Sequence, residues 1–464
     1  MNRRQLIKSL ASVPVIAGST GVSLMGSSLN PKDSAEQSYQ TCYTNEWKRT
    51  KPDYSLYLPP EPLADDGDNE HLLVVETPNG DLLATWSQGA YEMSRDYRTV
   101  SSRSKDGGVT WTRPEMIVGP TDHPGFTASF AVPLVSRSGR IYLLFNKHVG
   151  VTDMSYTITG FQRCIYSDDD GHTWVKGCDL EVRRRPRYDH PDPQMQKNLI
   201  FWQLPIRDSK DRMLLGFTRW SSLHPTRFPM ANGPNGWYPD SRSEFVRFDN
   251  IDEGPHPRDL KLTWLPEEDS LSVPCPFEPH TSRGYSLAEE PGVVLLPNGK
   301  LFTVMRTITG KIWYSVSADV DGRVWRKTEP LRLHDHGRFV THPKNTSPLY
   351  RLLDGRYILF FQNHDGTGYG AKGAGDMGAR RAPMFYSIGK FNPNSHQPIS
   401  FDEPKIFCDA ENIAVGPGNG GPEGGRTWLS FYGAMSYAGG KQIMWYPDRK
   451  HFLLGKDITA TMLA

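Results

Sequence analysis

The sequence predicts an all-β fold made of short strands and tight turns, and two observations carry this prediction. The chain of 464 residues contains 43 glycines, 37 prolines, 12 tryptophans, 20 tyrosines and 20 phenylalanines. Glycine and proline favour turns and aromatic residues favour strands, so this composition suits many short strands. A unit of apolar strand, turn and apolar strand also recurs along the chain, which favours one closed β architecture over several separate domains.

The repeated unit is visible six times in the sequence. Each copy has a polar turn containing glycine or aspartate, with an apolar strand after it and another apolar run before it. The copies include residues 78–86, 137–145, 209–217, 297–305, 353–361 and 422–431. No domain linker interrupts them, so residues 31–464 are expected to form one domain. Residues 38–66 or the C-terminus are expected to supply closing strands or part of a seventh unit.

Three segments share a turn motif. Residues 104–111 (SKDGGVTW) and 167–174 (SDDDGHTW) fit S-x-D-x-G-x-x-W, and residues 317–325 (SADVDGRVW) contain one extra residue. In such a hairpin, aspartate caps backbone amides, glycine adopts positive φ and tryptophan packs beneath the turn. The motif resembles the Asp-box of sialidase-type β-propellers. This resemblance implies a single β-propeller in which these turns join the third and fourth strands of a blade.

The N-terminus resembles a twin-arginine export signal. Arg3 and Arg4 precede an apolar run that is too short and too rich in serine and glycine to span a membrane. We therefore expect residues 1–30 to be an export signal and the protein to be periplasmic or secreted. Five cysteines exclude a complete disulfide framework, while Cys164 and Cys178 either pair across one hairpin or remain free thiols.

The net charge of +1 argues against a protein that coats nucleic acid, because such proteins need a wide basic surface. We also expect a monomer with no membrane partner. Any attraction for anions must be local, as in residues 183–193 (RRRPRYDHPDP), where Arg185 and Arg187 flank Tyr188. On a propeller this stretch would connect two blades on the face where ligands usually bind. The same argument places on that face the residues His123, His148, Arg219, Arg306, His364 and Tyr432.

The propeller resemblance first suggests a sialidase. Sialidases hold a carboxylate with three arginines and use a Tyr–Glu pair with an aspartate acid. The family's first arginine belongs to an F/Y-R-I-P motif near the first blade, and residues 54–86 contain no arginine. Arg306 could be another of the three, and Glu289 or Glu290 could be the glutamate. A sialidase-like exo-glycosidase is therefore the alternative interpretation.

A polysaccharide lyase is the leading interpretation. β-Elimination removes a proton next to a uronate carboxylate, whose charge an arginine can neutralise through its planar fork. A tyrosine near cations can serve as base and acid, with a histidine as its partner. The cations beside Tyr188 fit this composition. The chain resembles the β-propeller ulvan lyases, which cleave a sulfated rhamnose–uronate polysaccharide.

That resemblance implies seven blades, whereas six are visible. It also implies Tyr188 as base and acid, His123 as its partner and His148 as a second active-site histidine; we assign carboxylate neutralisation to Arg219. We expect an acidic sulfated polysaccharide to contact the substrate-binding residues Arg185, Arg187, Trp220, Tyr238, Arg306, Lys344 and His364. A non-catalytic propeller that binds anionic glycans is the third interpretation.

One pattern suggests a metal. His334 and His336 flank Asp335, and Cys275, His280 or Cys408 could complete a set of ligands of the kinds that zinc accepts. The spacing matches no established zinc motif, so we predict at most a structural zinc. The chemistry itself requires no cofactor.

Overall fold

The structure is a computed structural model, and the part of the chain that it describes is almost entirely β. The described residues are 43, 45–120, 126–150, 153–155, 157–223, 240–268, 273–274, 286–367, 380–418, 421 and 424–464. Its helical segments are short and include single turns at Ile251–Glu253, Pro257–Asp259 and Ala438–Gly440, and the helix α3 (Ala460–Leu463). No helix among the described residues is long and apolar enough to cross a membrane.

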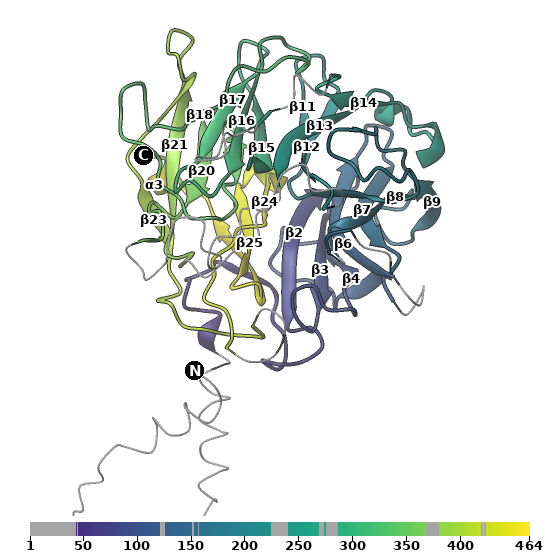
Figure 1. The fold of residues 1–464 in the computed structure, drawn as a ribbon. Coiled ribbons are helices and arrows are strands. Elements are labelled where there is room, and N and C mark those ends of the chain that lie inside the picture. The colour runs from purple at the N-terminus through teal and green to yellow at the C-terminus, as the bar shows by residue number, and fades with distance from the viewer. Residues whose placement is uncertain are drawn as a thin grey trace, which may run out of the picture.

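The strands follow one another in antiparallel groups (Figure 1). The first group contains β2 (Asp68–Glu76), β3 (Leu82–Gly89), β4 (Arg98–Ser104) and β5 (Glu115–Val118). The second contains β6 (Thr127–Val135), β7 (Ile141–His148), β8 (Thr159–Ser167) and β9 (Val175–Asp179). The third contains β10 (Lys197–Phe201), β11 (Ile206–Arg207), β12 (Met213–Trp220), β13 (Ser241–Phe248) and β14 (Leu262–Leu265). A short β8–β10 pairing joins the second and third groups into one sheet.

The remaining strands repeat the arrangement. The fourth group contains β15 (Glu289–Leu295), β16 (Leu301–Arg306), β17 (Trp313–Val316) and β18 (Glu329–Pro330). The fifth contains β19 (Leu349–Arg351), β20 (Tyr357–Phe361), β21 (Met384–Phe391), β22 (Ile399–Phe401) and β23 (Lys405–Cys408). The sixth contains β24 (Ala434–Ser436), β25 (Ile443–Asp448), β26 (Phe452–Asp457) and β1 (Tyr54–Tyr57). The predicted strand–turn–strand units correspond to the first two strands of the first, second, fourth and fifth groups, and in the third group the unit at 209–217 joins β11 to β12.

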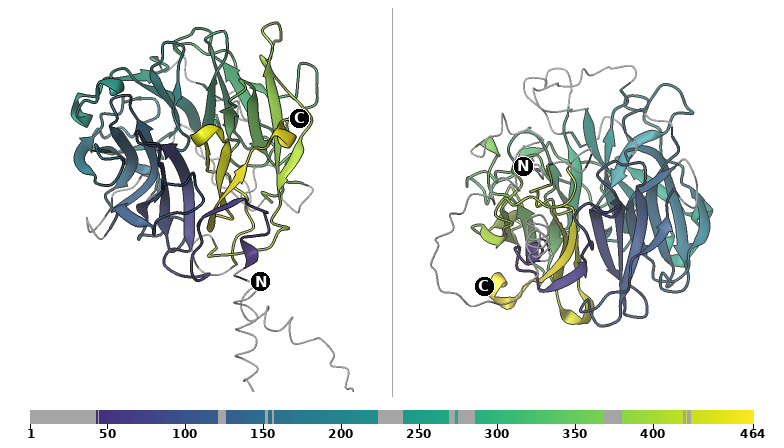
Figure 2. Two further views of the ribbon diagram at one scale, coloured as in Figure 1. Left: turned by 180° about the vertical axis from the view of Figure 1, so that it is seen from behind. Right: turned by 90° about the horizontal axis from the view of Figure 1, so that it is seen from below.

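The two ends of the described chain meet in the sixth group. β1, from the N-terminal side, pairs antiparallel with β26, so the expectation that residues 38–66 supply a closing strand is confirmed. Figure 2 shows the same arrangement from behind and from below, with the C-terminal strands beside the N-terminal ones. Pairing between distant ends protects strand edges that would otherwise be open.

The S-x-D-x-G-x-x-W segments form the predicted hairpin turns. In the turn between β8 and β9, Asp169 accepts hydrogen bonds from the backbone and hydroxyl of Thr173 at 2.8 and 2.6 Å. Gly171 has a φ of 81°, and its N–H donates to Ser167 Oγ at 2.9 Å. A side chain at Gly171 would also crowd Leu83 of the first group. The turn therefore needs glycine both for its conformation and for its packing against the neighbouring strands.

Aliphatic and aromatic side chains between adjacent groups form the core. One cluster unites residues of the fifth and sixth groups, including Phe360, Phe431 and Tyr446, and the Phe431 and Tyr446 rings stack at 4.6 Å. Cys164 and Cys178 lie directly opposite each other on β8 and β9, and both are free thiols.

Candidate active site

The first strands of three groups share a backbone distortion. β2, β6 and β15 each shift register against the following strand. At these shifts His71, Phe130 and Glu290 have φ values of 57°, 53° and 49°. Ser87 Oγ accepts the Phe130 N–H at 3.0 Å, and Thr218 Oγ1 accepts the Glu290 N–H at 2.6 Å. Such bulges re-aim side chains and are frequent next to functional sites, so these three residues mark a candidate site.

Glu290 forms a buried triad with Tyr432 and Arg306. The Tyr432 hydroxyl donates to Glu290 Oε1 at 2.5 Å. Arg306, the last residue of β16, donates from Nη1 to both Glu290 oxygens at 2.8 and 2.9 Å and to Tyr432 Oη at 2.8 Å. All three residues are at most 6% exposed. The triad therefore holds one phenol between a carboxylate and a guanidinium.

The charge states of the triad follow from its surroundings. Burial raises the pKa of Tyr432 well above its usual value, and the Glu290 charge raises it further. The phenol therefore keeps its proton and donates it to Glu290. Burial opposes the charge of Arg306, but Glu290 and its other neighbours outweigh that effect and raise the pKa of the guanidinium. Arg306 thus stays cationic beside the phenol oxygen.

Glu289 forms a second carboxylate centre beside the triad. Its Oε1 accepts a hydrogen bond from Trp220 Nε1 at 3.0 Å. Its Oε2 lies 3.5 Å from Arg306 Nε and 3.9 Å from Lys344 Nζ. Burial lowers the pKa of Lys344 to about 8. The structure thus brings together three of the predicted substrate-binding residues, Trp220, Arg306 and Lys344.

The first group contributes negative charge to this region. Asp68 and Glu70 lie at the start of β2, within the segment where a sialidase would have its first arginine. Arg426 pairs with Asp68 at 2.9 Å, and Tyr97 Oη donates to Glu70 Oε1 at 2.6 Å. Both carboxylates are buried and therefore depend on these partners for compensation. The start of β2 thus carries negative charge, where a sialidase would have the positive charge of its first arginine.

Lys450 links the acidic cluster to Tyr432. It lies in the turn between β25 and β26, and its Nζ is 2.5 Å from Glu70 Oε2 and 2.7 Å from Glu92 Oε1. The same nitrogen is 5.6 Å from the centre of the Tyr432 ring. His71 meets that ring edge-on at 5.0 Å, and burial lowers the pKa of His71 to about 4, so its ring is neutral. Tyr432 therefore lies between Glu290, which accepts its proton, and Lys450, which pairs with Glu70 and Glu92.

Arg219 and Arg185 lie in a different cluster. Arg219 donates to Asp189 at 2.7 Å and to Glu244 at 3.0 Å, and Arg185 donates to Glu244 at 3.0 Å. All four residues are buried. Both guanidiniums thus have carboxylate partners within the protein. The assignment of Arg219 to a substrate carboxylate stays a prediction.

Tyr188 lies beside this second cluster. It is 2% exposed, with the guanidiniums of Arg242 and Arg187 at 5.1 and 5.7 Å from its ring centre. Two cations, Arg242 and Arg187, therefore lie near the Tyr188 ring, as expected for this tyrosine. Arg187 is exposed, whereas Arg185 is not.

Strand geometry explains why the predicted residues separate into two clusters. Arg219 and Trp220 are consecutive in β12, so their side chains point to opposite sides of the strand. Arg219 reaches Glu244 and Asp189, while Trp220 reaches Glu289. A site that uses both residues on one ligand would conflict with this alternation.

The other predicted residues are dispersed. His148 is buried at the end of β7, where its Nδ1 accepts the Gly150 N–H at 3.1 Å. His364 is half-buried, and its Nε2 lies 3.2 Å from the Ala382 carbonyl oxygen. The predicted residues His123, Tyr238, Cys275 and His280 lie outside the described residues.

The predicted zinc site has no geometric support in the described part of the chain. His334 and His336 are exposed, and Cys408 is a buried residue of β23. Within the described ranges, no group of three or more His, Cys, Asp or Glu side chains could hold a metal ion.

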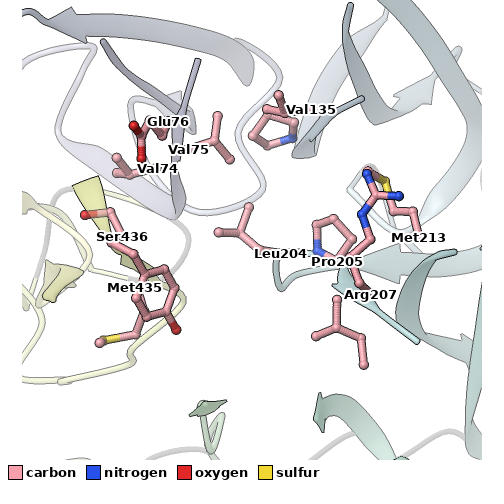
Figure 3. Close-up of a pocket in the computed structure, with 13 residues that line it drawn as sticks. Val74, Val75, Glu76, Val135, Leu204, Pro205, Arg207, Met213, Met435 and Ser436 are labelled. Atoms are coloured by element: carbon pink, nitrogen blue, oxygen red, sulfur yellow. The ribbon is translucent and has the colours of Figure 1, made fainter. Parts of the chain in front are cut away.

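A separate pocket of about 260 Å³ lies at the C-terminal ends of β2 and β6 (Figure 3). It is mainly apolar, and Figure 3 shows Val75, Leu204 and Met435 around it, with Arg207 at one side. Val74 to Glu76 end β2, at the opposite end from Asp68 and Glu70. This pocket is therefore distinct from the Tyr432 site.

The sequence held a partial signal for this site. The sequence predicts Glu289 or Glu290 as a sialidase glutamate, and it predicts that Tyr432 lies on the ligand-binding face. The bulge that directs Glu290 onto Tyr432 has no sequence pattern comparable to a turn motif. Asp68, Glu70, Glu92, Arg381, Arg426 and Lys450 were not predicted.

Comparison with known proteins supports the fold. No family model and no curated protein matches the chain. Solved structures do match, with TM-scores of 0.55 for a protein of unknown function from Dyadobacter fermentans and 0.55 for a Streptococcus pneumoniae sialidase. The identities are 13% and 12%, covering 88% of this chain in both cases and 97% and 71% of the other chains.

A leech intramolecular trans-sialidase matches with a TM-score of 0.52 at 14% identity, covering 88% of this chain and 71% of the other. These likenesses show that the chain has the fold of sialidase-type β-propellers.

Proposed function

We propose that the protein is a six-bladed β-propeller glycosidase that uses Tyr432 as its nucleophile. The observation that carries this proposal is the buried Tyr432 hydroxyl, 2.5 Å from Glu290 Oε1 and 2.8 Å from Arg306 Nη1. A neutral phenol is a weak nucleophile, and a base within hydrogen-bond reach is the usual means of activating such a group. Glycosidases that use tyrosine in this role are established among sialidases.

The proposed reaction follows from this geometry. As Tyr432 Oη bonds to the anomeric carbon, its proton passes to Glu290 and the bond to the leaving oxygen breaks. The leaving oxygen takes a proton from solvent. Water then attacks the anomeric carbon and gives a proton to solvent, while the glycosyl–tyrosine bond breaks and Glu290 returns its proton to Tyr432 Oη. Arg306 stays within hydrogen-bond distance of the phenol oxygen, where it can stabilise the negative charge that develops during proton transfer. Two displacements at the same carbon predict retention of configuration.

The fold supports a carbohydrate substrate without specifying it. The similar solved structures include a sialidase and a trans-sialidase, which are sugar-processing enzymes. The acidic residues Asp68 and Glu70 at the start of β2 argue against a sialidase-type arginine in that position. We therefore propose a sialidase-like mechanism with a different arrangement of substrate-binding cations.

A lyase acting on a sulfated uronate polysaccharide is the second candidate. The observation that favours it is the pair of guanidiniums, those of Arg242 and Arg187, near the Tyr188 ring. In this reaction Tyr188 would take the proton, and the product would carry a conjugated double bond. Arg219, which pairs with Asp189 and Glu244 within the protein, would neutralise the uronate carboxylate.

A panel of anionic glycans, including sialosides and ulvan, distinguishes the candidates. Hydrolysis by the Tyr432 site predicts new reducing ends without an increase in ultraviolet absorbance. A lyase predicts new reducing ends together with the absorbance of an unsaturated uronate. A binding propeller predicts neither product, and that result with every glycan would overturn both enzymatic proposals.

The predicted export, implied by residues 1–30, is tested separately by N-terminal sequencing of protein from the periplasm and medium.

A further inference from the structure

The free thiols of Cys164 and Cys178 lie directly opposite each other on two antiparallel strands, β8 and β9. Side chains of directly opposite residues project to the same side of a sheet. The α-carbons of such a pair are about 4.5–5.5 Å apart, and disulfides join α-carbons about 4.4–6.8 Å apart. The strand register therefore suits a disulfide between these two residues.

The electrostatics of the two thiols agree with this proximity. Burial raises the pKa of Cys164, and negative charge on Cys178 raises it further. Burial also raises the pKa of Cys178, so both groups are protonated at neutral pH. Cys408, the other free cysteine in the described ranges, lies on β23 in the fifth group. Cys164 and Cys178 are therefore each other's natural partners for oxidation in this part of the chain.

The two thiols differ in accessibility, which sets the order of their reactions. Cys164 is 0% exposed in a core cluster that includes residues of the second and third groups, whereas Cys178 is half-buried. A disulfide in solution therefore reaches Cys178 more easily than Cys164.

Oxidised glutathione supplies the chemistry of the oxidation. The Cys178 thiolate attacks one sulfur of this disulfide, forms a mixed disulfide and releases the first glutathione thiol. The Cys164 thiolate then attacks the Cys178 sulfur, the bond from that sulfur to glutathione breaks, and the second glutathione thiol leaves. Two protein thiols lose two electrons and two protons, and one glutathione disulfide gains them as two thiols.

β9 is the element that such a bond would hold. In the described part of the chain it pairs only with β8, and three of its five residues are exposed. The β8–β9 ladder also shifts register directly after Cys164. β9 contacts the turn Pro257–Asp259 of the third group, and the charges of this turn act on Cys178. A bond at Cys178 would therefore fasten an outer strand at the point where two groups meet.

We propose that Cys164 and Cys178 form a redox-active thiol pair, and that oxidation to a disulfide fixes β9 to β8. This proposal is independent of the glycosidase proposal, because neither cysteine belongs to the Tyr432 site. The bond would close the loop of residues 165–177, and closing such a loop restricts the unfolded chain. For a chain of this length we expect the thermal midpoint to rise by roughly 3 °C.

The test is oxidation of the reduced full chain by oxidised glutathione at mildly alkaline pH. The remaining thiols are then alkylated in denaturant, and the protein is digested with trypsin without reductant. Cleavage after Arg163, Lys176 and Arg183 leaves each cysteine in its own peptide, residues 164–176 and 177–183. We expect these peptides as one linked species that reductant separates, with the number of alkylated cysteines lowered by two from five.

Cys408→Ala is the matched control, because Cys408 is also a buried free cysteine. This variant should give the same linked peptides and the same rise in thermal midpoint on oxidation. Cys178→Ser should give neither, and it changes a half-buried position, so it should fold as the wild type does.

Three results would overturn the thiol pair. The first is recovery of both peptides in alkylated form after oxidation. The second is a lasting glutathione adduct on Cys178, which would show that the Cys164 sulfur cannot reach it. The third is a link from either cysteine to Cys42, Cys275 or Cys408. A Cys164–Cys178 bond that leaves the thermal midpoint unchanged would contradict the fixing of β9.

Discussion

At the scale of single residues, the proposed chemistry depends on one hydroxyl group held between opposite charges. In the proposed reaction Tyr432 keeps its proton until Glu290 accepts it, and Arg306 stabilises the oxygen that loses it. We predict that Tyr432→Phe lowers the rate of glycoside cleavage by about 10³-fold or more, the scale expected for loss of a nucleophile. Steady-state kinetics on a hydrolysed glycan measures this effect.

Tyr350→Phe is the control for that substitution. Tyr350 is also a buried tyrosine, and its hydroxyl donates to the Gly433 carbonyl oxygen at 2.5 Å, outside the triad. The variant should keep wild-type kcat. A similar loss of rate in both variants would show that the effect comes from packing, not from chemistry.

We predict that the binding of an anionic substrate depends on pH through the charge of Lys344. Burial lowers its pKa to about 8, so the ammonium is present below that pH and is lost as the pH rises through it. We expect KM for an anionic substrate to increase above pH 8. In Lys344→Arg the increase should move to higher pH, because guanidinium remains charged there. A KM profile that is identical in both proteins would contradict the involvement of Lys344.

At the scale of elements, the S-x-D-x-G-x-x-W turns are local devices of stability. Asp169 accepts the Thr173 N–H and hydroxyl, and the pKa of Asp169 is lowered to about 2 by the hydrogen bonds that outweigh its slight burial. The folded-state pKa is below the ordinary value, so this stabilisation is present above pH 4 and is lost as the pH falls through about 2. Asp169→Ala should lower the unfolding free energy by about 1 kcal/mol at pH 7, as for a lost cap.

Asp168→Ala is the neighbouring control for the turn. Asp168 pairs with Arg140 on the surface, and exposed ion pairs contribute little. Chemical denaturation of both variants at pH 7 compares the turn cap with the surface pair. Equal destabilisation of the two variants would argue against the capping role of Asp169.

The buried ion pairs of Arg219 in the third group are expected to contribute more to stability than the surface pair of Asp168. Arg219 lies between two buried carboxylates, so Arg219→Met should destabilise the protein by about 3–5 kcal/mol, the usual cost of breaking a buried pair from one side. Denaturant unfolding provides the measurement. A stable Arg219→Met variant that loses cleavage of a uronate polymer would instead support the lyase interpretation.

At the scale of the whole molecule, the fold is closed by the pairing of β1 with β26. Removing residues 1–57 would expose the edge of β26, so we predict aggregation and loss of cooperative unfolding. A variant lacking residues 1–30, the predicted export signal, should unfold as the full chain does. Light scattering and thermal unfolding distinguish these outcomes, and a monomeric, cooperatively folded protein without residues 1–57 would contradict the closing role of β1.

The sequence predicted the fold better than the site, because the two depend on information of different range. Turns such as 167–174 are encoded by neighbouring residues, so their spacing predicted the repeated strands. The charged run at 183–187 predicts a site for anions, yet Arg185 is bound by Glu244, which is distant in sequence. The bulge at Glu290 and the contact between Tyr432 and Glu290 likewise depend on long-range pairing that no local pattern shows.

The most direct test of the central claim is covalent trapping of Tyr432. A fluorinated glycosyl fluoride of a hydrolysed sugar slows release of the glycosyl group, so the intermediate accumulates and peptide mass spectrometry can locate it. We predict one added glycosyl group on the peptide containing Tyr432, and none in Tyr432→Phe. A glycosyl group on Glu290 or Glu92, or cleavage that inverts configuration without any adduct, would contradict tyrosine as the nucleophile.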